Sequence, residues 1–423
     1  MKIAVIGGGS TYTPELIDGV ARMRDDLPVE QIVLVDPDAD RLAAVGRVSA
    51  RIMAERGHGT EVAWTSDLDA AVDGASAVLL QLRVGGQAAR HGDESWPQEC
   101  GCIGQETTGA GGLAKALRTV PVVLDIARRV RERALDSAWI VDFTNPVGIV
   151  TRALLDEGHR AVGLCNVAIG FQRRFAGYLG VEPGRVSLDH VGLNHLTWER
   201  ALRLDGVDLL PEILDKHGED LARDVGIPLD LMRRLGMVPS YYLRYFYRHD
   251  AVLASQRADP QTRAQKVTDL ERDLLARYAD PQWTYDPALL EQRGGAHYSD
   301  AALQLVASLV NDTGDVQVVN VRNRGTLPFL PDEAVIEVPA RIGSDGAHAQ
   351  PVEPVDHLYK GLIAHVAAYE ELAVDAALRG GRQRVFDALL AHPLIGQTDI
   401  ADGLTSRLLA HNAEHLPWAG VAA

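Results

Sequence analysis

The feature that most constrains the fold of this sequence is a glycine-rich turn directly after a short apolar run at the N-terminus. Residues Ile3–Ile6 are typical of a buried strand and lead into Gly7–Ser10. Thr13 and Pro14 then suit the N-cap and first position of a helix. Strand, glycine turn and helix in this order predict a dinucleotide site, because glycines let the main chain approach a pyrophosphate at a helix N-terminus.

A second apolar run, Ile32–Val35, ends at Asp36. A carboxylate at that place can bind the adenosine ribose hydroxyls and disfavours a 2′-phosphate, which favours NAD over NADP. Tyr12 stands where a third glycine is usual, and a tight turn without a ligand is the plainer alternative. The strand context and Asp36 favour the nucleotide. The residues expected to bind NAD are Gly7, Gly8, Gly9, Ser10, Thr11, Asp36, Arg41 and Arg83.

The first part of the chain alternates apolar runs with helical patterns. Further strands are expected at Ala77–Leu82 and Trp139–Phe143, with a helix over Ala114–Ala134 between them. Continuous apolar runs are typical of strands buried on both faces, and their alternation with helices predicts a parallel sheet. The expected fold class is α/β, with a doubly wound, Rossmann-like N-terminal domain over residues 1–175.

The pattern changes after about residue 170. Arg185–Asn194 and Thr197–Leu209 are predicted to pair as a hairpin, and Val316–Val338 is a further β-rich stretch. Helices are expected over 211–235, 262–279 and 299–311, and through most of 355–415. We expect a C-terminal α+β lobe over residues 176–423 that provides substrate, metal and oligomer contacts.

Bulk properties exclude several classes of function. The formal charge of −16 would repel nucleic acids and anionic lipid, and no apolar stretch approaches the ~20 residues of a membrane span. The apolar run at the N-terminus is too short for a signal peptide, and three cysteines do not make a disulfide framework. We therefore expect a cytoplasmic protein that binds neither nucleic acid nor membranes.

Several expected strand ends carry a polar group suited to a ligand site. Arg83, with Arg90 shortly after it, Asn145, the pair Cys165-Asn166 and the pair Asn194-His195 each follow an apolar run. In a doubly wound sheet, ligands bind at the carboxyl ends of the strands. Each residue alone is more often structural, but their convergence favours a site. Cys165 and His195 could ligate a metal, although a thiolate and an imidazole would favour zinc or iron.

A tyrosine-rich segment, 239–247, holds four of the eleven tyrosines. Its composition is most typical of an aromatic core helix, but a tyrosine beside a cation can also serve as a base. Arg263 and Arg293 could each supply positive charge for an anionic substrate.

These motifs together resemble glycoside hydrolase family four, the NAD- and metal-dependent glycosidases, over nearly the whole chain. The resemblance is to the branch that acts on 6-phospho-β-glucosides, and it depends on the ordered set Gly7–Ser10, Arg83–Arg90, Gly101–Gly112, Thr144–Pro146, Cys165–Val167, Asn194-His195 and the tyrosine-rich segment. It implies oxidation of sugar carbon 3 by NAD⁺, proton removal at carbon 2, elimination at carbon 1, water addition and re-reduction, a route distinct from the usual two-carboxylate mechanism.

The resemblance also implies roles for individual residues. Cys165 and His195 match the metal ligands, usually of Mn²⁺, and Tyr242 matches the base, with Tyr241 as the alternative. The matches to substrate-binding positions are Arg90, Asn145, Asn166 and Arg263. Members acting on α-glycosides carry an aspartate acid where this chain has Asn166, which fits the β-branch and leaves the general acid open. Relatives imply a homodimer or homotetramer.

Two other functions compete with the glycosidase. An NAD-dependent 2-hydroxy acid dehydrogenase would share the N-terminal architecture, but it would not need Cys165 with His195. A non-catalytic NAD sensor would bind the cofactor and turn over no sugar.

Overall fold

The computed structural model describes residues 1–283, 285–286 and 297–419, so Arg293 lies outside the described residues. Its strands form one continuous mixed sheet in the order β10-β8-β7-β12-β11-β6-β5-β4-β1-β2-β3, with β13 and β9 at its side. The parallel part contains β1 (Lys2–Ile6), β2 (Gln31–Val35), β3 (Glu61–Thr65), β4 (Ala77–Leu80), β5 (Trp139–Asp142) and β6 (Ala161–Gly163).

Strands β1 to β6 confirm the predicted doubly wound α/β arrangement. Within this set each strand pairs in parallel with its neighbours, and β1 lies between β2 and β4, where the strand order reverses. Such a switch point opens a crevice at the carboxyl ends of the strands. The helices of this part are α1 (Thr13–Arg22), α2 (Ala39–Glu55), α3 (Leu68–Val72), α4 (Gly86–Glu99), α5 (Gly109–Arg133), α6 (Val147–Asp156) and α7 (Asn166–Leu179).

The sheet continues with antiparallel strands from the second part of the chain. Its hairpin confirms the predicted pairing, and its turn is Asn194-His195. The junction with the parallel part is a short pairing of β11 with β6. The strands are β7 (Val186–Leu193), β8 (Leu196–Leu204), β9 (Val207–Asp208), β10 (Val238–Pro239), β11 (Val316–Arg322), β12 (Val335–Gly343) and β13 (Gly346–Ala349). The domain boundary at 175/176 stays a prediction.

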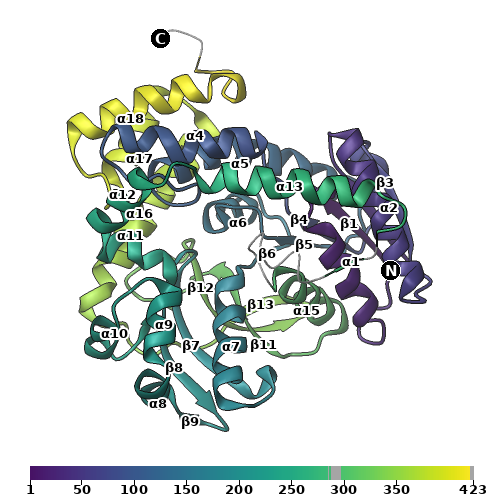
Figure 1. The fold of residues 1–423 in the computed structure, drawn as a ribbon, viewed down its shortest axis with the longest axis horizontal. Helices are drawn as coiled ribbons and strands as arrows, with labels where there is room; N and C mark the ends of the chain where they lie inside the picture. Colours follow the sequence, from purple (N-terminus) through teal and green to yellow (C-terminus); the bar gives the residue numbers. More distant parts are fainter. Residues whose placement is uncertain (284, 287–296, 420–423) are drawn as a thin grey trace.

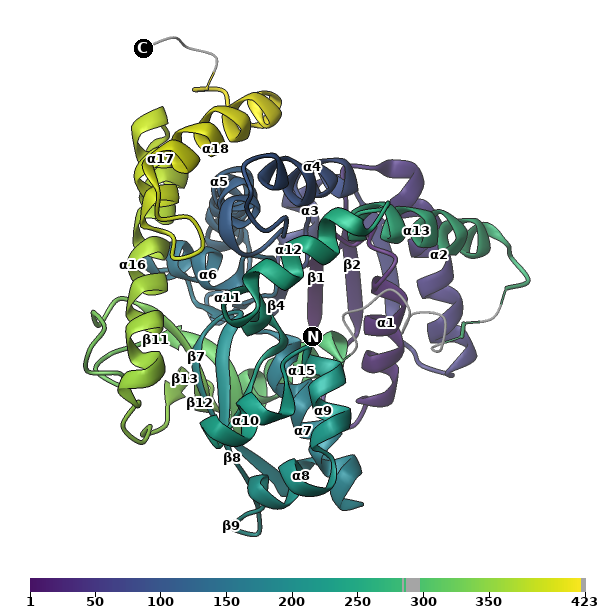
Figure 2. The same cartoon turned by 60° about the vertical axis from the view of Figure 1, so that its left-hand side comes forward.

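Helices from the second part extend over the first part as well as beside their own strands. Helix α13 lies alongside α4, and the C-terminal helices stack beside α5 (Figures 1 and 2). These helices are α8 (Leu210–Lys216), α9 (Gly218–Val225), α10 (Leu229–Leu235), α11 (Arg244–Tyr247), α12 (His249–Ala258), α13 (Arg263–Ala279), α15 (Tyr298–Asn311), α16 (His357–Arg379), α17 (Arg382–Ala391) and α18 (Thr398–His411).

The tyrosine-rich segment differs from the single core helix that its composition favours. It forms a short β10 strand, a 3-10 turn at Tyr241–Leu243 and the one-turn helix α11. The 3-10 turn follows β10, which pairs with β8 of the hairpin. This connection brings Tyr241 and Tyr242 toward the carboxyl ends of the parallel strands. No helix in the described part of the chain is both long and apolar enough to span a bilayer.

Candidate active site

The glycine turn after β1 packs closely against β2 and the end of β4. A Cβ added to Gly7, whose φ is +86°, would lie 2.8 Å from the Leu82 main chain. At Gly8 it would lie 2.7 Å from the Cβ of Leu34. Since real Cβ atoms essentially never approach so closely, these positions require glycine. The turn therefore holds the main chain against both β2 and the end of β4, as a pyrophosphate-binding turn does.

Asp36 reaches back from the end of β2 to this turn. Its Oδ2 accepts a hydrogen bond from the Gly9 amide at 3.2 Å, and a Cβ on Gly9 would meet the same carboxyl group at 2.8 Å. Burial raises the pKa of Asp36. Arg41 closes the turn from the other side, because its Nε donates to the Gly9 carbonyl at 2.6 Å and its guanidinium pairs with Glu271 of α13 at 3.3 Å.

The start of α1 differs from the prediction in one detail. Thr13 is the first helical residue rather than the N-cap, and Tyr12 precedes it. The Thr13 hydroxyl donates to the Gly8 carbonyl at 2.9 Å and accepts from the Gln81 amide at 2.8 Å. It therefore ties the glycine turn to the end of β4 instead of capping the helix.

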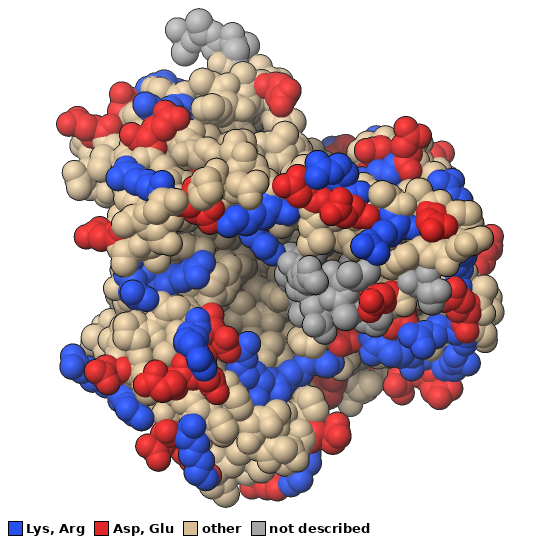
Figure 3. Space-filling view, viewed as in Figure 1, with Lys and Arg blue, Asp and Glu red and all other residues tan. Residues whose placement is uncertain are grey.

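One large cavity, with a volume of about 1470 Å³, joins the glycine turn to the tyrosine-rich segment. It opens as a hollow in the face of the molecule, with lysine and arginine side chains around it (Figure 3). Eleven of the predicted site residues line it: Gly7, Ser10, Asp36, Arg41, Arg83, Arg90, Asn145, Asn166, Tyr241, Tyr242 and Arg263. The other five, Gly8, Gly9, Thr11, Cys165 and His195, lie behind this lining or are buried beside it.

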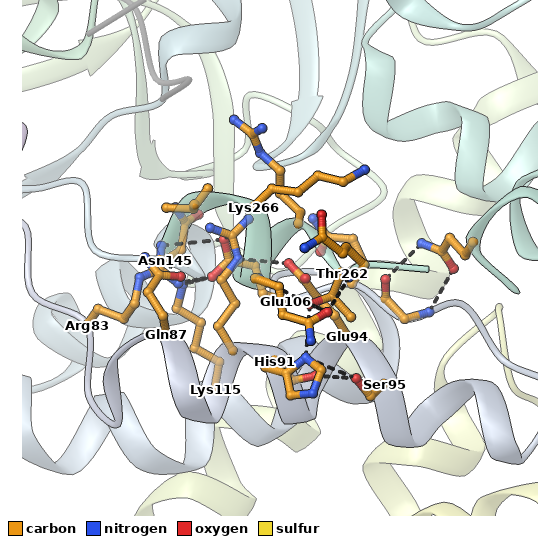
Figure 4. Close-up of a pocket in the computed structure, with 18 of the residues that line it drawn as sticks. Arg83, Gln87, His91, Glu94, Ser95, Glu106, Lys115, Asn145, Thr262 and Lys266 are labelled. Carbon is orange, nitrogen blue, oxygen red and sulfur yellow. Dashed lines mark hydrogen bonds and ion pairs between the residues drawn. The ribbon is translucent and has the colours of Figure 1, made fainter. Parts of the chain in front are cut away.

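Glu106 is a buried carboxylate shared by three cations at the cavity wall (Figure 4). It forms ion pairs with Arg83, with Lys115 at 2.6 Å and with Arg90 at 3.1 Å. Although burial alone would raise it, the pKa of Glu106 is held well below its usual range by these charges. Burial and the charge of Arg83 lower the pKa of Lys115 to about 7. With the three cations charged, this cluster has an excess of positive charge, which suits an anionic ligand.

Helix α13 is fixed on α4 at the same wall. Glu94 accepts hydrogen bonds from the Ala264 amide and from Arg90 Nε, both at 2.8 Å. His91 contacts the Thr262 hydroxyl at 2.9 Å. Because these contacts hold the first turn of α13, Arg263 is brought to the cavity with Arg90, although the two residues are far apart in the sequence.

Cys165 is buried at the N-cap of α7, where β6 ends. Its Sγ lies 3.8 Å from the hydroxyl of Tyr298, which lines the cavity. Burial, followed by the charge of Glu337, raises the pKa of the thiol to about 12. On the neighbouring strand end, the side-chain oxygen of Asn145 is buried and has no hydrogen-bond partner among the described residues, so it can accept from a ligand hydroxyl.

His195 occupies the hairpin turn with φ +63° and is buried. Neither ring nitrogen has a hydrogen-bond partner in the described part of the chain. Burial lowers the pKa of His195 to about 4, so the imidazole is neutral at neutral pH. Its ring stacks on Tyr242 with centroids 3.7 Å apart, and Tyr242 in turn contacts Tyr241 at 4.1 Å.

These residues fit a divalent metal with few protein ligands. A neutral, buried imidazole without a partner is the form of histidine that binds a metal, and Cys165 offers a second donor. Within residues 1–283, 285–286 and 297–419, no group of three or more His, Cys, Asp or Glu is placed to hold a metal ion. A metal at Cys165 and His195 would therefore need ligand or water oxygens, which Mn²⁺ prefers.

Sequence reasoning gave no role to several polar residues at the site. Lys115 is a lone charge in an apolar helical run, and Glu337 is a lone charge in the apolar run Val335–Val338. A charge isolated in an apolar pattern is a usable signal, because such positions are buried and need a partner. Tyr298 carries no comparable signal.

The comparisons with known proteins agree with this geometry. The family model "Family 4 glycosyl hydrolase" matches residues 2–181, and the model of that family's C-terminal domain matches 190–395. A probable 6-phospho-beta-glucosidase of Bacillus subtilis is 36% identical, over 99% of this chain and 97% of that protein.

Solved structures are similar over the same length. The 6-phospho-beta glucosidase from Thermotoga maritima, with manganese, NAD⁺ and glucose-6-phosphate, has a TM-score of 0.90 at 33% identity, covering 98% of this chain and 99% of that one. A 6-phospho-alpha-glucosidase from gut microorganisms has the same TM-score at 25% identity, covering 99% of both chains. With both family models matched along its length, the chain belongs to glycoside hydrolase family four.

Proposed function

We propose that this chain is an NAD- and Mn²⁺-dependent glycosidase that hydrolyses 6-phospho-β-glucosides. The observation that carries the proposal is the large cavity that joins the glycine turn, the Glu106 cation cluster and Tyr242, whose ring stacks on the buried His195. Relatives named 6-phospho-beta-glucosidase support the substrate class, at 36% and 33% identity over nearly the whole chain.

The two cofactors supply what side chains cannot: NAD⁺ a hydride acceptor and donor for carbon 3, and Mn²⁺ a Lewis acid for the oxygen on that carbon. Gly7–Ser10 and Thr11 would receive the pyrophosphate, and Asp36 the adenosine ribose. Arg41 braces the turn through the Gly9 carbonyl, and Arg83 would be a further contact to NAD. Cys165 and His195 would hold the metal.

Tyr242 is assigned as the base that removes the carbon 2 proton, with Tyr241 as the alternative. Burial raises the pKa of the Tyr242 phenol well above its ordinary value. Its ring stacks on His195, so a cation held by that imidazole would act on the phenol at short range and favour its ionised form. The base therefore depends on the metal site being filled.

The substrate is assigned to the cationic wall. Arg90 and Arg263 supply positive charge for a sugar phosphate, while Asn145 and Asn166 offer amide groups to hydroxyls. Asn166 cannot donate a proton as a carboxylic acid does, which supports the β-branch. A cytoplasmic location and assembly as a homodimer or homotetramer stay part of the proposal, and three free cysteines are consistent with a reducing compartment.

The test is a screen of nitrophenyl glycosides in both anomers, with and without the 6-phosphate, at saturating NAD⁺ and Mn²⁺. Hydrolysis of the phosphorylated β-anomer should need both cofactors, and in D₂O the product should carry deuterium at carbon 2. Undiminished hydrolysis after both cofactors are stripped, with no deuterium, would overturn the proposal. A 2-hydroxy acid dehydrogenase would instead accumulate NADH, and an NAD sensor would hydrolyse nothing.

A further inference from the structure

Three buried ionisable side chains form a chain directly behind the Asn194-His195 turn. His190 of β7 contacts Glu199 of β8 at 2.6 Å through Nδ1 and Glu337 of β12 at 3.1 Å through Nε2. All three side chains are at most 1% exposed. Their positions on three adjacent strands place them inside the sheet's packing, where an uncompensated charge is costly.

Glu337 and Glu199 share one histidine as their charged partner. Burial alone would lower the pKa of His190, but the two carboxyl groups raise it to about 10, so the imidazole is protonated at neutral pH. Burial alone would raise the pKa of Glu337, yet hydrogen bonds from His190, Asn194 and Asn320 lower it. No lysine or arginine pairs with Glu337 in the described part of the chain, so its carboxyl group has no cation of its own.

Glu337 also contacts the turn that carries a proposed metal ligand. Its Oε2 accepts a hydrogen bond from the side-chain amide of Asn194 at 2.9 Å, and Asn194 directly precedes His195. Glu337 is therefore placed to act on His195 through Asn194.

We propose that Glu337 is a positioning residue for the divalent metal, fixing the Asn194-His195 turn and balancing the charge of the bound cation. The proposal rests on the assignment of Cys165 and His195 as metal ligands in the proposed function. It accounts for a buried carboxyl group that has no lysine or arginine partner among the described residues. Groups behind a metal's direct ligands commonly change metal affinity by roughly 10–100-fold.

The test measures Mn²⁺ binding directly, by electron paramagnetic resonance of free Mn²⁺, without substrate. Glu337→Gln keeps an oxygen acceptor for Asn194 and removes the charge, and it should weaken Mn²⁺ binding by roughly 10–100-fold. NAD⁺ binding, measured by calorimetry, should stay unchanged. Glu199→Gln is the matched control, because Glu199 is equally buried and contacts the same His190 but not Asn194. It should weaken Mn²⁺ binding far less.

Unchanged Mn²⁺ affinity in folded Glu337→Gln would overturn the inference, as would an equal loss in both variants. If Glu337→Gln fails to fold, Asn194→Ala replaces it, because that substitution cuts the link and leaves the buried trio intact. Wild-type affinity in Asn194→Ala would then overturn the positioning role. A wild-type protein that binds no Mn²⁺ would overturn the proposed function and this inference together.

Discussion

The two turns that build this site differ in what they demand of their residues. After β1 the chain passes through Gly7, Gly8 and Gly9, where any added Cβ would lie 2.7–2.8 Å from a neighbouring atom. After β7 it passes through Asn194, whose amide is held by the buried Glu337, and His195, whose ring nitrogens have no partner among the described residues. The first turn presents main chain to a ligand, and the second presents side chains.

The difference follows from how the strands beside each turn are paired, in parallel at β1 and antiparallel at β7. A parallel strand ends at a helix N-terminus, whose amides already suit an anion, so the turn needs only to be small. A hairpin offers no such dipole, and its chemistry has to come from side chains. We therefore expect NAD⁺ binding to weaken when a larger residue replaces a glycine of the first turn. We expect metal-dependent activity to fall when a functional side chain of the hairpin turn is removed.

The largest effect is expected from His195→Ala. Loss of the metal would remove several kcal/mol of transition-state stabilisation, and the contribution of the base would be lost with it because the base depends on the filled metal site. Together these losses correspond to roughly 10⁴-fold or more in kcat. NAD⁺ affinity should be retained, because the glycine turn is untouched. Steady-state kinetics with a Mn²⁺ titration and NAD⁺ calorimetry check both statements, and a variant that keeps Mn²⁺-dependent turnover would remove His195 from the metal site.

Tyr242→Phe keeps the aromatic ring that stacks on His195 of the hairpin turn and removes the hydroxyl group. Loss of a general base lowers the rate by roughly 10²–10⁴-fold, and exchange of the carbon 2 proton with D₂O should fall by as much. Tyr241→Phe serves as the matched variant and should retain most of the exchange. The reverse ranking, read by NMR of the product, would make Tyr241 the base.

Gly9→Ala tests size at the first turn. The new methyl group would meet the Asp36 carboxyl at 2.8 Å, and overpacking of this kind costs about 1–3 kcal/mol. NAD⁺ should therefore bind about tenfold or more weakly, while Mn²⁺ binding stays unchanged. Gly177→Ala on the outside of α7 is the control, because a Cβ there meets nothing within 4 Å. Equal NAD⁺ affinity in the two variants would contradict the steric argument.

The smallest effect is a pH dependence from the hairpin region. The pKa of His190 is raised from 6.5 to about 10 by Glu199 and Glu337, against the effect of burial. Its contribution to the free energy of unfolding is therefore complete below pH 6.5 and is lost as the pH rises through 10. Urea denaturation at several pH values should show this decline, and His190→Gln should flatten it. An equally steep decline in that variant would assign it to other groups.

Local patterns explain what the sequence could predict. The glycine turn, β1, β2 and the β7–β8 hairpin are each encoded within a few residues, and the structure confirms them. The strand β3 (Glu61–Thr65) was not predicted, because it lies at the sheet edge and its residues are only partly buried.

The candidate site was harder to predict where it joins distant segments. Glu337 contacts His190 and Asn194, which lie 147 and 143 residues away, and no local pattern encodes such a pairing. The roles assigned to Cys165, His195 and Tyr242 came from the resemblance to a family rather than from periodicity. The structure adds the burial of Cys165 and His195, the stacking of His195 on Tyr242 and an imidazole that has no hydrogen-bond partner among the described residues.

The hairpin turn also limits how this sequence can change over time. Leu193 pairs with Leu196 across a loop of only two residues, one of which is the proposed metal ligand His195. An insertion that shifted the register of β8 by one residue would exchange the two faces of the strand and move Trp198 out of the core. Surface loops usually absorb insertions and deletions. The two-residue hairpin loop is too short to absorb them easily. We therefore expect related sequences to differ in length at other loops.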